Sequence, residues 1–455
     1  MSFEVINPAT GEKEGEFPAW EDGQIDRALA EAAAVAPQWA ERPLAERCEL
    51  MRGVARILRD NKEQYASLIT REMGKLINEA RAEIEKCAWV CEYYAETAPE
   101  FLHDEPIESD AGKSYVAYLP LGTVLAVMPW NFPFWQVFRF AAPALCAGNT
   151  GLLKHASNVP QCARAIEDIF REAGLPDGVF TSLMIRAGQV QKVIEDPRVH
   201  AVTLTGSEPA GRQVAAAAGA VLKKSVLELG GSDAFIVLED ADLDEAVKSA
   251  IASRFLNCGQ SCIAAKRFIV VDAVAEDFVA RFKAGVESLK PGDPMDENTS
   301  LAPMARTDLR EELHKQVVDS LAAGAVNVTG CDFDGEKPGA YYKPSILDQV
   351  GSGMRAYSEE LFGPVAIVIR ARDEADALRI ANDTTFGLGG NVWTRDAARG
   401  ERLARQLDCG CAFVNSFVKS DPRLPFGGIK HSGYGRELSH HGIHEFVNAK
   451  TVWIK

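Results

Sequence analysis

The stretch Ala201-Val-Thr-Leu-Thr-Gly-Ser-Glu-Pro-Ala-Gly211 joins a short strand-like run to a helical one through a tight turn. The same alternation extends on both sides, from residue 149 to residue 231. It predicts strands at 151–154, 179–185, 201–205 and 224–229, with helices at 159–173, 189–195 and 209–220. Strands that alternate with helices in this way build a parallel sheet. The stretch therefore predicts a doubly wound α/β domain of the nucleotide-binding kind.

The turn in this stretch lacks the GxGxxG fingerprint of many dinucleotide-binding domains. Gly206 leaves the backbone free to turn sharply. Ser207 can cap the following helix, whose first amides would then face a pyrophosphate. A Ser shortly before Pro209 is also ordinary helix capping. Taken alone, the turn leaves both interpretations open.

A second α/β unit follows residue 232, while the chain begins with helices. Apolar spacing of three and four residues predicts helices within 25–36, 44–59 and 65–94. Two short β-rich runs lie within 114–128. The terminal run 445–454 is strand-like without an obvious local partner, which suggests an edge lent to another subunit. In the second unit we expect strands at 234–238, 267–271, 326–328, 366–369 and 391–393, and helices at 243–256, 274–289, 309–323 and 374–382.

Composition limits the function classes. With 455 residues the chain exceeds the usual size of a single core, so two large domains are expected. Lys and Arg number 49 against 65 Asp and Glu, a net charge of −16, which argues against nucleic-acid or anionic-membrane partners. Ten cysteines without framework spacing and no signal-peptide pattern at the start predict a reducing cytoplasm. Prolines interrupt the most apolar stretch, 119–148, so no membrane span is expected, and no metal site is predicted.

Cys262 is the candidate nucleophile. It lies in Arg254-Phe-Leu-Asn-Cys-Gly-Gln-Ser-Cys-Ile-Ala-Ala-Lys-Arg267, where Gly259 allows a sharp turn and the apolar run 268–271 can hold the loop rigid. Free cysteines, however, are often buried as small hydrophobic residues. This stretch by itself does not decide between packing and chemistry.

Three further polar residues stand out. Asn131 lies between Trp130 and Phe132, where its amide can donate to an oxygen that gains charge, or can simply form a turn. Glu228 ends a predicted strand, either as a general base or as a solvated carboxylate. Arg139 lies in an apolar helix, where it either reaches the surface or meets a carboxylate.

Six motifs in order give the chain a family resemblance. They are Pro129-Trp-Asn-Phe-Pro133, Thr205-Gly-Ser207, Glu228-Leu-Gly-Gly231, Gly259-Gln-Ser-Cys262, Glu360-Leu-Phe-Gly-Pro364 and Pro425-Phe-Gly-Gly428. Together they resemble the aldehyde dehydrogenase superfamily over essentially the whole chain. The resemblance favours Cys262 as a nucleophile rather than a packing residue.

The resemblance implies two doubly wound parallel-sheet domains and a small β oligomerisation flap. The dinucleotide-binding domain would comprise residues 1–102 and 122–230, and the catalytic domain residues 231–438. The flap would comprise residues 103–121 and 439–455. It also implies a homodimer or homotetramer.

Site roles carry over residue by residue. Cys262 resembles the thiol that attacks the aldehyde, Asn131 the amide of the oxyanion hole, and Glu228 the base that activates water for thioester hydrolysis. Lys154 and Glu360 match positions that hold ribose hydroxyls, and Ser207 matches a pyrophosphate contact. The cofactor-binding residues implied are Trp130, Lys154, Ser157, Gly206, Ser207, Gly211, Leu229, Glu360 and Phe362.

Ser157 bears on the choice of cofactor. Relatives that prefer NAD often have Glu at this position, and a carboxylate there would repel an adenosine 2′-phosphate. Ser157 removes that repulsion, while Lys154 and His155 add positive charge. We expect NADP to be preferred and NAD to be tolerated.

Arg139 bears on the substrate. Family members that oxidise succinate semialdehyde have an arginine at this position for the substrate carboxylate, and Ser420 lies near another position used for it. Leu256 departs from the pattern, because some of those enzymes carry a second arginine there. Succinate semialdehyde is the expected substrate. Glutarate semialdehyde, a CoA-acylating reaction and a fold without turnover are the alternatives.

Overall fold

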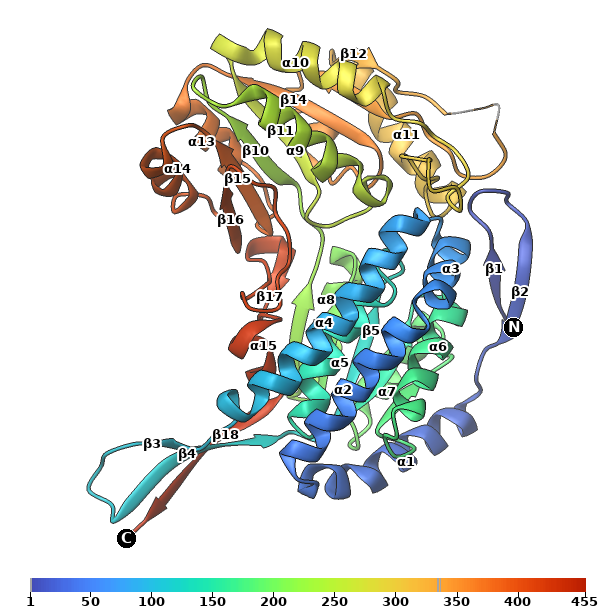
Figure 1. Ribbon diagram of the computed structural model, residues 1–455, viewed down its shortest axis with the longest axis vertical. Coiled ribbons are helices and arrows are strands. Elements are labelled where there is room, and N and C mark those ends of the chain that lie inside the picture. Colours follow the sequence, from blue (N-terminus) through green and yellow to red (C-terminus); the bar gives the residue numbers. More distant parts are fainter. Residues whose placement is uncertain (1, 334, 336) are drawn as a thin grey trace.

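The computed structural model describes residues 2–333, 335 and 337–455. Two sheet-containing bodies lie one above the other in Figure 1, and a narrow ribbon of strands projects from the lower one. The chain passes from the lower to the upper body between β9 and β10, and returns between β16 and β17. The two bodies therefore meet where these crossing segments run.

The lower body contains a six-stranded sheet in which every pairing is parallel except that of β17 with β9. Its order is β17 (Gly433–Tyr434), β9 (Lys224–Glu228), β8 (Ala201–Thr205), β5 (Thr123–Met128), β6 (Thr150–His155) and β7 (Phe180–Ser182). The helices that follow its strands are α5 (Trp135–Cys146), α6 (Pro160–Glu172), α7 (Val190–Glu195) and α8 (Glu208–Ala220). The alternation predicted for residues 149–231 is confirmed.

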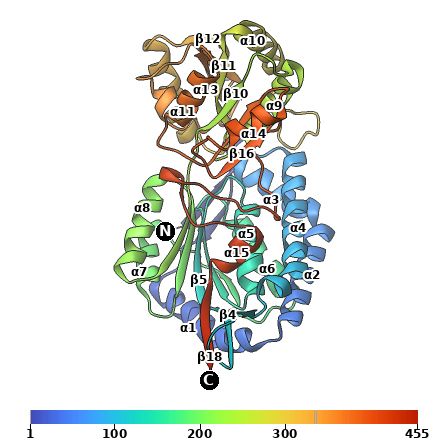
Figure 2. The same cartoon turned by 90° about the vertical axis from the view of Figure 1, so that its left-hand side faces the viewer.

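Successive side chains of β5 point to opposite faces of this sheet. Val124 and Ala126 join the core cluster formed with α2, α3, α4, α5 and α6, whereas Leu125 joins the cluster formed with α1, α7 and α8. Figure 2 shows helices on both sides of the strands. The sheet is buried on both faces, as a doubly wound fold requires.

The first hundred residues contain more than the predicted helices. The helices are α1 (Asp22–Glu41), α2 (Leu44–Asp60), α3 (Lys62–Met73) and α4 (Ile77–Phe101). Gly74, with a φ of +81°, ends α3, so the helical run predicted over 65–94 is two helices rather than one. A hairpin of β1 (Ser2–Ile6) and β2 (Lys13–Pro18) precedes them and was not predicted, because β2 has no buried residue and lacks an apolar pattern.

The upper body contains the second sheet, in the order β12-β13-β14-β11-β10-β15-β16, which is parallel except between β12 and β13. The prediction missed β13, β16, α12 and α14, all of them eight residues or shorter. Its strands are β10 (Asp233–Val237), β11 (Ala265–Val271), β12 (Val326–Thr329), β13 (Ser345–Asp348), β14 (Val365–Ala371), β15 (Gly389–Trp393) and β16 (Cys411–Val414). Its helices are α9 (Leu243–Phe255), α10 (Asp272–Glu287), α11 (Thr307–Ala322), α12 (Arg355–Ser358), α13 (Glu374–Asn382) and α14 (Ala397–Ala404).

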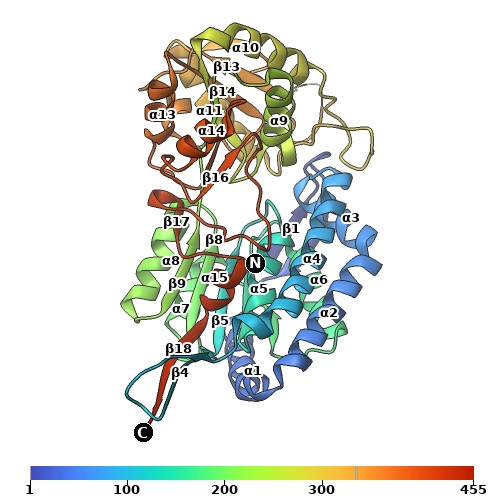
Figure 3. The same cartoon turned by 60° about the vertical axis from the view of Figure 1, so that its left-hand side comes forward.

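The projecting ribbon is a three-stranded antiparallel sheet, β18-β4-β3. Its strands are β3 (Glu105–Pro106), β4 (Lys113–Pro120) and β18 (Val447–Ile454). The terminal strand does have a partner in its own chain, since β18 pairs with β4 along its whole length. The short helix α15 (Ser439–His444) precedes β18 and packs on the lower body near α4 and α5 (Figure 3). Trp453 is half exposed on this sheet, and the subunit contact proposed for it stays a prediction.

None of the helices in the described part of the chain combines the length and the apolar character that crossing a membrane requires.

The side chain of Arg267 in β11 joins this strand to two other segments of the upper body. Its replacement therefore tests the fold. Its buried guanidinium donates from Nε to Ser232 O at 2.8 Å, from Nη1 to Ile380 O at 2.9 Å and from Nη2 to Ala381 O at 2.8 Å. Arg267→Met should reduce the free energy of unfolding by about 3 kcal/mol, because three buried carbonyls lose a charged donor. Urea unfolding would measure this, with exposed Arg281→Met as the control; equal midpoints for the two variants would contradict it.

Candidate active site

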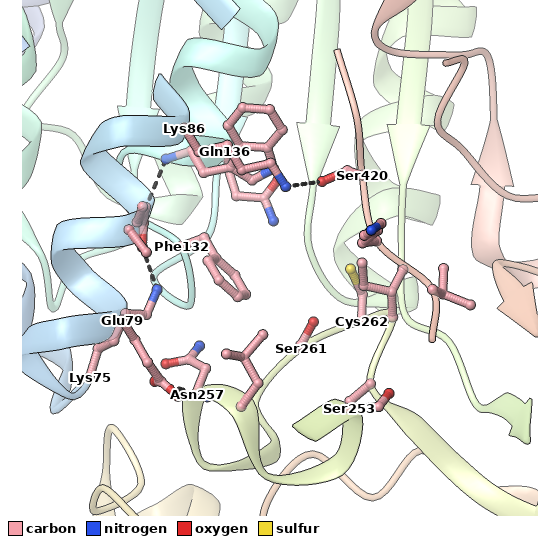
Figure 4. Close-up of a pocket in the computed structure, with 18 of the residues that line it drawn as sticks. Lys75, Glu79, Lys86, Phe132, Gln136, Ser253, Asn257, Ser261, Cys262 and Ser420 are labelled. Carbon is pink, nitrogen blue, oxygen red and sulfur yellow. Dashed lines mark hydrogen bonds and ion pairs between the residues drawn. The ribbon is translucent and has the colours of Figure 1, made fainter. Parts of the chain in front are cut away.

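Cys262 lies between the 3-10 turn η2 (Leu256–Gly259) and β11, at the junction of the two bodies. Its side chain lines a cavity of about 380 Å³. Figure 4 shows the sulfur turned toward this cavity, with Phe132 and Gln136 on one side and Ser420 on the other. All ten cysteines are free, so the thiol is available for chemistry. The predicted nucleophile therefore faces a space in which a small molecule fits.

The loop before Cys262 has an unusual backbone. Asn257 and Cys258 both have a φ of 54°, and Gly259 has a φ of +72°. A Cβ on Gly259 would lie 2.3 Å from Gly363 O and 2.4 Å from an Arg254 nitrogen, so only glycine fits there. The turn expected at Gly259 is present, and it is tighter than the sequence indicates.

The side chain of Arg254 forms hydrogen bonds with the backbone of this loop. Its buried Nη2 donates to Gly259 O at 2.7 Å and to Leu361 O at 3.2 Å, and also to Gly363 O. The same guanidinium therefore binds the nucleophile loop and the loop that carries Glu360. On the other side, Lys266 Nζ donates to Cys262 O at 3.0 Å.

The thiol is protonated at neutral pH in this state of the site. Burial raises the pKa of the Cys262 thiol to about 12, although Arg139 and Lys266 favour the thiolate. Since the thiolate is the attacking form, Cys262 needs a base or added positive charge nearby before it reacts.

Asn131 is brought to the nucleophile loop by side-chain contacts. Its Nδ2 donates to Gln260 O at 3.1 Å, and Asn257 Nδ2 donates to Asn131 O at 2.7 Å. Asn131 Oδ1 is buried without a hydrogen-bond partner in the described part of the chain. The amide thus lies against the segment two residues before Cys262, as an oxyanion donor must, although Nδ2 is already engaged by a carbonyl.

Glu228 ends β9 inside the junction rather than in solvent. It is 2% exposed, and neither carboxyl oxygen has a hydrogen-bond partner among the described residues. A Cβ on Gly427 would lie 2.5 Å from Glu228 Oε1, so that glycine makes room for the carboxyl group. Burial, and then the neighbouring Glu437 carboxylate, raise the pKa of Glu228 well above its ordinary value. Glu228 is therefore not the solvated carboxylate that the sequence left open.

Arg139 does not reach the surface, and the carboxylate that it meets belongs to its own chain. It is 2% exposed. It forms an ion pair with Glu437 through Nε, its Nη2 is 3.4 Å from Thr205 Oγ1, and its guanidinium lies 4.7 Å from the Phe426 ring centre. It still lines the cavity. A guanidinium in an apolar helix needs a counter-ion, and the chain supplies one from a segment about three hundred residues away.

Lys86 also lines the cavity and was missed from the sequence. Its Nζ donates to Ser420 Oγ at 2.7 Å and lies 4.3 Å from the Trp135 ring centre (Figure 4). Glu79, Glu83 and Lys86 follow one another at helical spacing and therefore share a face of α4. That spacing was the available signal, but charges on one face of an amphipathic helix usually mark its solvated side.

The expected phosphate and ribose residues lie around the C-terminal ends of the lower sheet's strands. Lys154 is in β6, and its half-buried ammonium has no hydrogen bond or ion pair to any described residue. Ser157 follows that strand and lines a second cavity, which Arg186 also lines. Ser207 is the N-cap residue of α8, but its side chain makes no capping hydrogen bond. Gly206 N donates to Glu228 O at 2.9 Å.

Close packing shapes the rest of this edge. A Cβ on Gly211 would lie 2.6 Å from a Leu229 methyl carbon, so this glycine lets α8 approach β9 closely. The Trp130 and Phe362 rings meet edge to face, with their centres 5.9 Å apart. A free ammonium, an uncapped helix start and a glycine-lined approach fit an anionic dinucleotide.

Glu360 is not free for a ribose in this state. It forms an ion pair with Lys266 at 3.1 Å and accepts from Gly231 N at 3.1 Å. A hydroxyl would have to share or replace one of these donors. Glu360 nevertheless lies at the same junction as Cys262, because Lys266 contacts both residues.

Comparison with known proteins places this site in a family. The model of the aldehyde dehydrogenase family matches residues 1–452. The chain is 50% identical over 457 residues to a Synechocystis protein named probable succinate-semialdehyde dehydrogenase (NADP+), with all of both chains covered. It is 50% identical to the Escherichia coli succinate semialdehyde dehydrogenase (NAD(P)+), with 98% of this chain and 97% of that protein covered.

A solved structure gives the same result. The succinic semialdehyde dehydrogenase of Streptococcus pyogenes, in complex with NADP+, superposes with a TM-score of 0.97 at 40% identity, and 99% of each chain is covered. The two sheets, the position of the cysteine loop and these matches agree, and the chain belongs to the aldehyde dehydrogenase family.

Proposed function

We propose that this protein oxidises succinate semialdehyde to succinate with NADP as the preferred cofactor. The observation that carries the proposal is a cavity that has a thiol, Cys262, in its wall and also reaches the guanidinium of Arg139. The thiol accounts for aldehyde chemistry, and the guanidinium accounts for a substrate that carries a carboxylate. Relatives that are 50% identical and bear the same activity in their names support the substrate.

Each polar residue has one task in this reaction. The Cys262 thiol gives up its proton to solvent, and the sulfur then bonds to the aldehyde carbon while Asn131 donates to the oxygen, which gains negative charge. A nicotinamide dinucleotide held by Lys154, Ser157 and Ser207 would supply the hydride acceptor, and loss of hydride from that carbon would leave a thioester on Cys262. Glu228 then takes a proton from water, the water oxygen bonds to the carbon, and the carbon–sulfur bond breaks to release the acid.

The proposal includes a homodimer or homotetramer built through the β18-β4-β3 sheet, and a location in the cytoplasm. Half-exposed Trp453 and Ile454 on β18 support the subunit contact.

A CoA-acylating reaction is the second candidate function. The buried carboxylate of Glu228 beside the cysteine loop favours water as the acyl acceptor instead, because water needs a base and a thiolate does not.

Glu228→Gln should separate the two halves of the reaction. A glutamine cannot take a proton from water, so the variant should release a burst of about one equivalent of NADPH per active site. Its later turnover should be roughly 10²-fold or more slower than that of the wild type.

Because the pKa of Glu228 is raised, the release of the acid by the wild-type enzyme should become faster as the pH rises toward that pKa. Stopped-flow absorbance measures both the burst and this pH dependence, with Cys262→Ser as the variant that gives no burst. Steady turnover of Glu228→Gln at the wild-type rate would contradict the assignment.

Ser157→Glu should reverse the cofactor preference. A carboxylate beside the 2′-phosphate should lower kcat/KM with NADP by about 100-fold, since juxtaposed like charges cost several kcal/mol, and should change kcat/KM with NAD much less. Ser157→Ala is the matched control. In the wild type, a preference for NAD of about tenfold, or roughly 1.4 kcal/mol, would show that the interpretation of Ser157 is wrong.

Arg139→Ala should raise KM for succinate semialdehyde about tenfold or more, and KM for an uncharged aldehyde much less, because only the former carries a carboxylate. The single change leaves Glu437 buried without its counter-ion. Arg139→Ala combined with Glu437→Gln therefore serves as the control for folding. Equal effects on both aldehydes would remove Arg139 from the substrate site, and Ser420→Ala tests the neighbouring hydroxyl in the same assay.

A further inference from the structure

Lys86 is a cation in the wall of the cavity without a carboxylate partner in the described part of the chain. Its Nζ has two close neighbours, the Ser420 hydroxyl at 2.7 Å and the Trp135 ring at 4.3 Å. Both are polar or polarisable groups, but neither carries a negative charge. Taking an ammonium partly out of water without a counter-ion is costly, so a carboxylate ligand in the cavity would stabilise this group.

The carboxylates nearest to Lys86 are bound by other cations. Glu83 forms a buried ion pair with Lys75 and also accepts from the backbone N–H groups of Phe134 at 2.9 Å and Trp135 at 3.0 Å. Asp421 forms an ion pair with Arg423 at 2.6 Å. Neither is free to turn toward Lys86 without leaving its own partner.

Arg139, a buried cation that lines the same cavity, differs from Lys86 in this respect. Arg139 has Glu437 as an internal counter-ion, so a ligand must share its guanidinium with that carboxylate. Gln136, which lies about one turn before Arg139 on α5, is 2% exposed, and its Oε1 has no hydrogen-bond partner among the described residues. Lys86, Gln136 and Ser420 thus bring polar groups together in a cavity whose other walls include Phe132, Trp135 and Phe426.

Resting on the proposed function, we propose that Lys86 binds the substrate carboxylate together with Ser420 and is a specificity-determining residue for semialdehydes over uncharged aldehydes. Its ammonium replaces the second cation that Leu256 does not supply. The charge comes from α4 instead of from the segment before the nucleophile. Lys86 takes no part in bond making at Cys262, so it should affect substrate binding and not the chemical steps.

The ionisation of Lys86 gives this role a pH signature. Burial, and then the charge of Arg139, lower the pKa of Lys86 to about 8, while Cys87, Asp421 and Glu83 act in the opposite direction. A bound carboxylate favours the ammonium form. KM for succinate semialdehyde should therefore rise as the pH increases through about 8, whereas KM for butanal, which has no charge, should not follow that curve.

The test compares Lys86→Met with Lys86→Arg on succinate semialdehyde and on butanal, which has the same number of carbons. Lys86→Met should raise KM for the semialdehyde roughly tenfold to a hundredfold, the loss expected for one charge-assisted hydrogen bond. KM for butanal and kcat for both aldehydes should stay within about twofold, which also shows that the variant folds. Lys86→Arg should restore most of the affinity, and Lys248→Met removes an exposed charge as the matched control.

Two outcomes of the kinetic comparison would overturn the proposal, and they are distinguishable. If the wild type prefers the semialdehyde and Lys86→Met keeps that preference, Lys86 is not part of the carboxylate site and the proposed function stands. If the wild type does not discriminate between the two aldehydes, the proposed function fails, and the role of Lys86 fails with it. An affinity for succinate, measured by calorimetry, that Lys86→Met leaves unchanged would also count against the proposal.

Discussion

The position of the reactive sulfur depends on one buried guanidinium. Arg254 has no carboxylate partner in the described chain and instead donates to backbone carbonyls of Gly259, Leu361, Gly363 and Ala265. These carbonyls belong to the nucleophile loop, the start of β11 and the loop of Glu360. A buried charge that is satisfied by fixed carbonyls cannot move without leaving several of them unpaired. The position of the Cys262 loop relative to the Glu360 loop is therefore set before any ligand binds.

The junction between the two bodies is rich in charge, and most of that charge is paired. Arg139 binds Glu437, Lys266 binds Glu360 and Lys75 binds Glu83. Among the described residues, Lys86 and Glu228 have no opposite charge at hydrogen-bond distance, and no backbone carbonyls compensate them as carbonyls compensate Arg254. The proposed chemistry gives each of them a ligand group to act on, a carboxylate for Lys86 and a water for Glu228. A charge that neither an opposite charge nor the backbone compensates is thus one sign of a functional position.

The sequence predicted the architecture well where periodicity is strong. The alternation over residues 149–231 gave the lower sheet, and most helices of the upper body lie within a few residues of their expected positions. Short elements such as β13, β16 and α12 were missed, because four residues carry too little periodic signal. The ordered motifs gave the family, which no composition or spacing could give alone.

The candidate site was predicted less completely. Cys262, Glu228 and Asn131 come together at one junction as expected, but their roles stay predictions. The partner of Arg139 could not be predicted, because Glu437 is about three hundred residues away and no local pattern links the two. Lys86 was missed for a related reason, since its helix shows only an amphipathic pattern and the cavity it faces is completed by Ser420, more than three hundred residues later.

The chain crosses between the two bodies at residues 229–232 and returns after β16, and the reacting groups are divided between them. Cys262 belongs to the upper body, whereas Asn131 and Glu228 belong to the lower one. Each half can keep its own sheet and core intact while a small hinge-like opening pulls the sulfur away from the amide and the carboxyl group. On warming, catalytic activity should therefore be lost at a lower temperature than secondary structure. A ligand that contacts both bodies should stabilise the active arrangement.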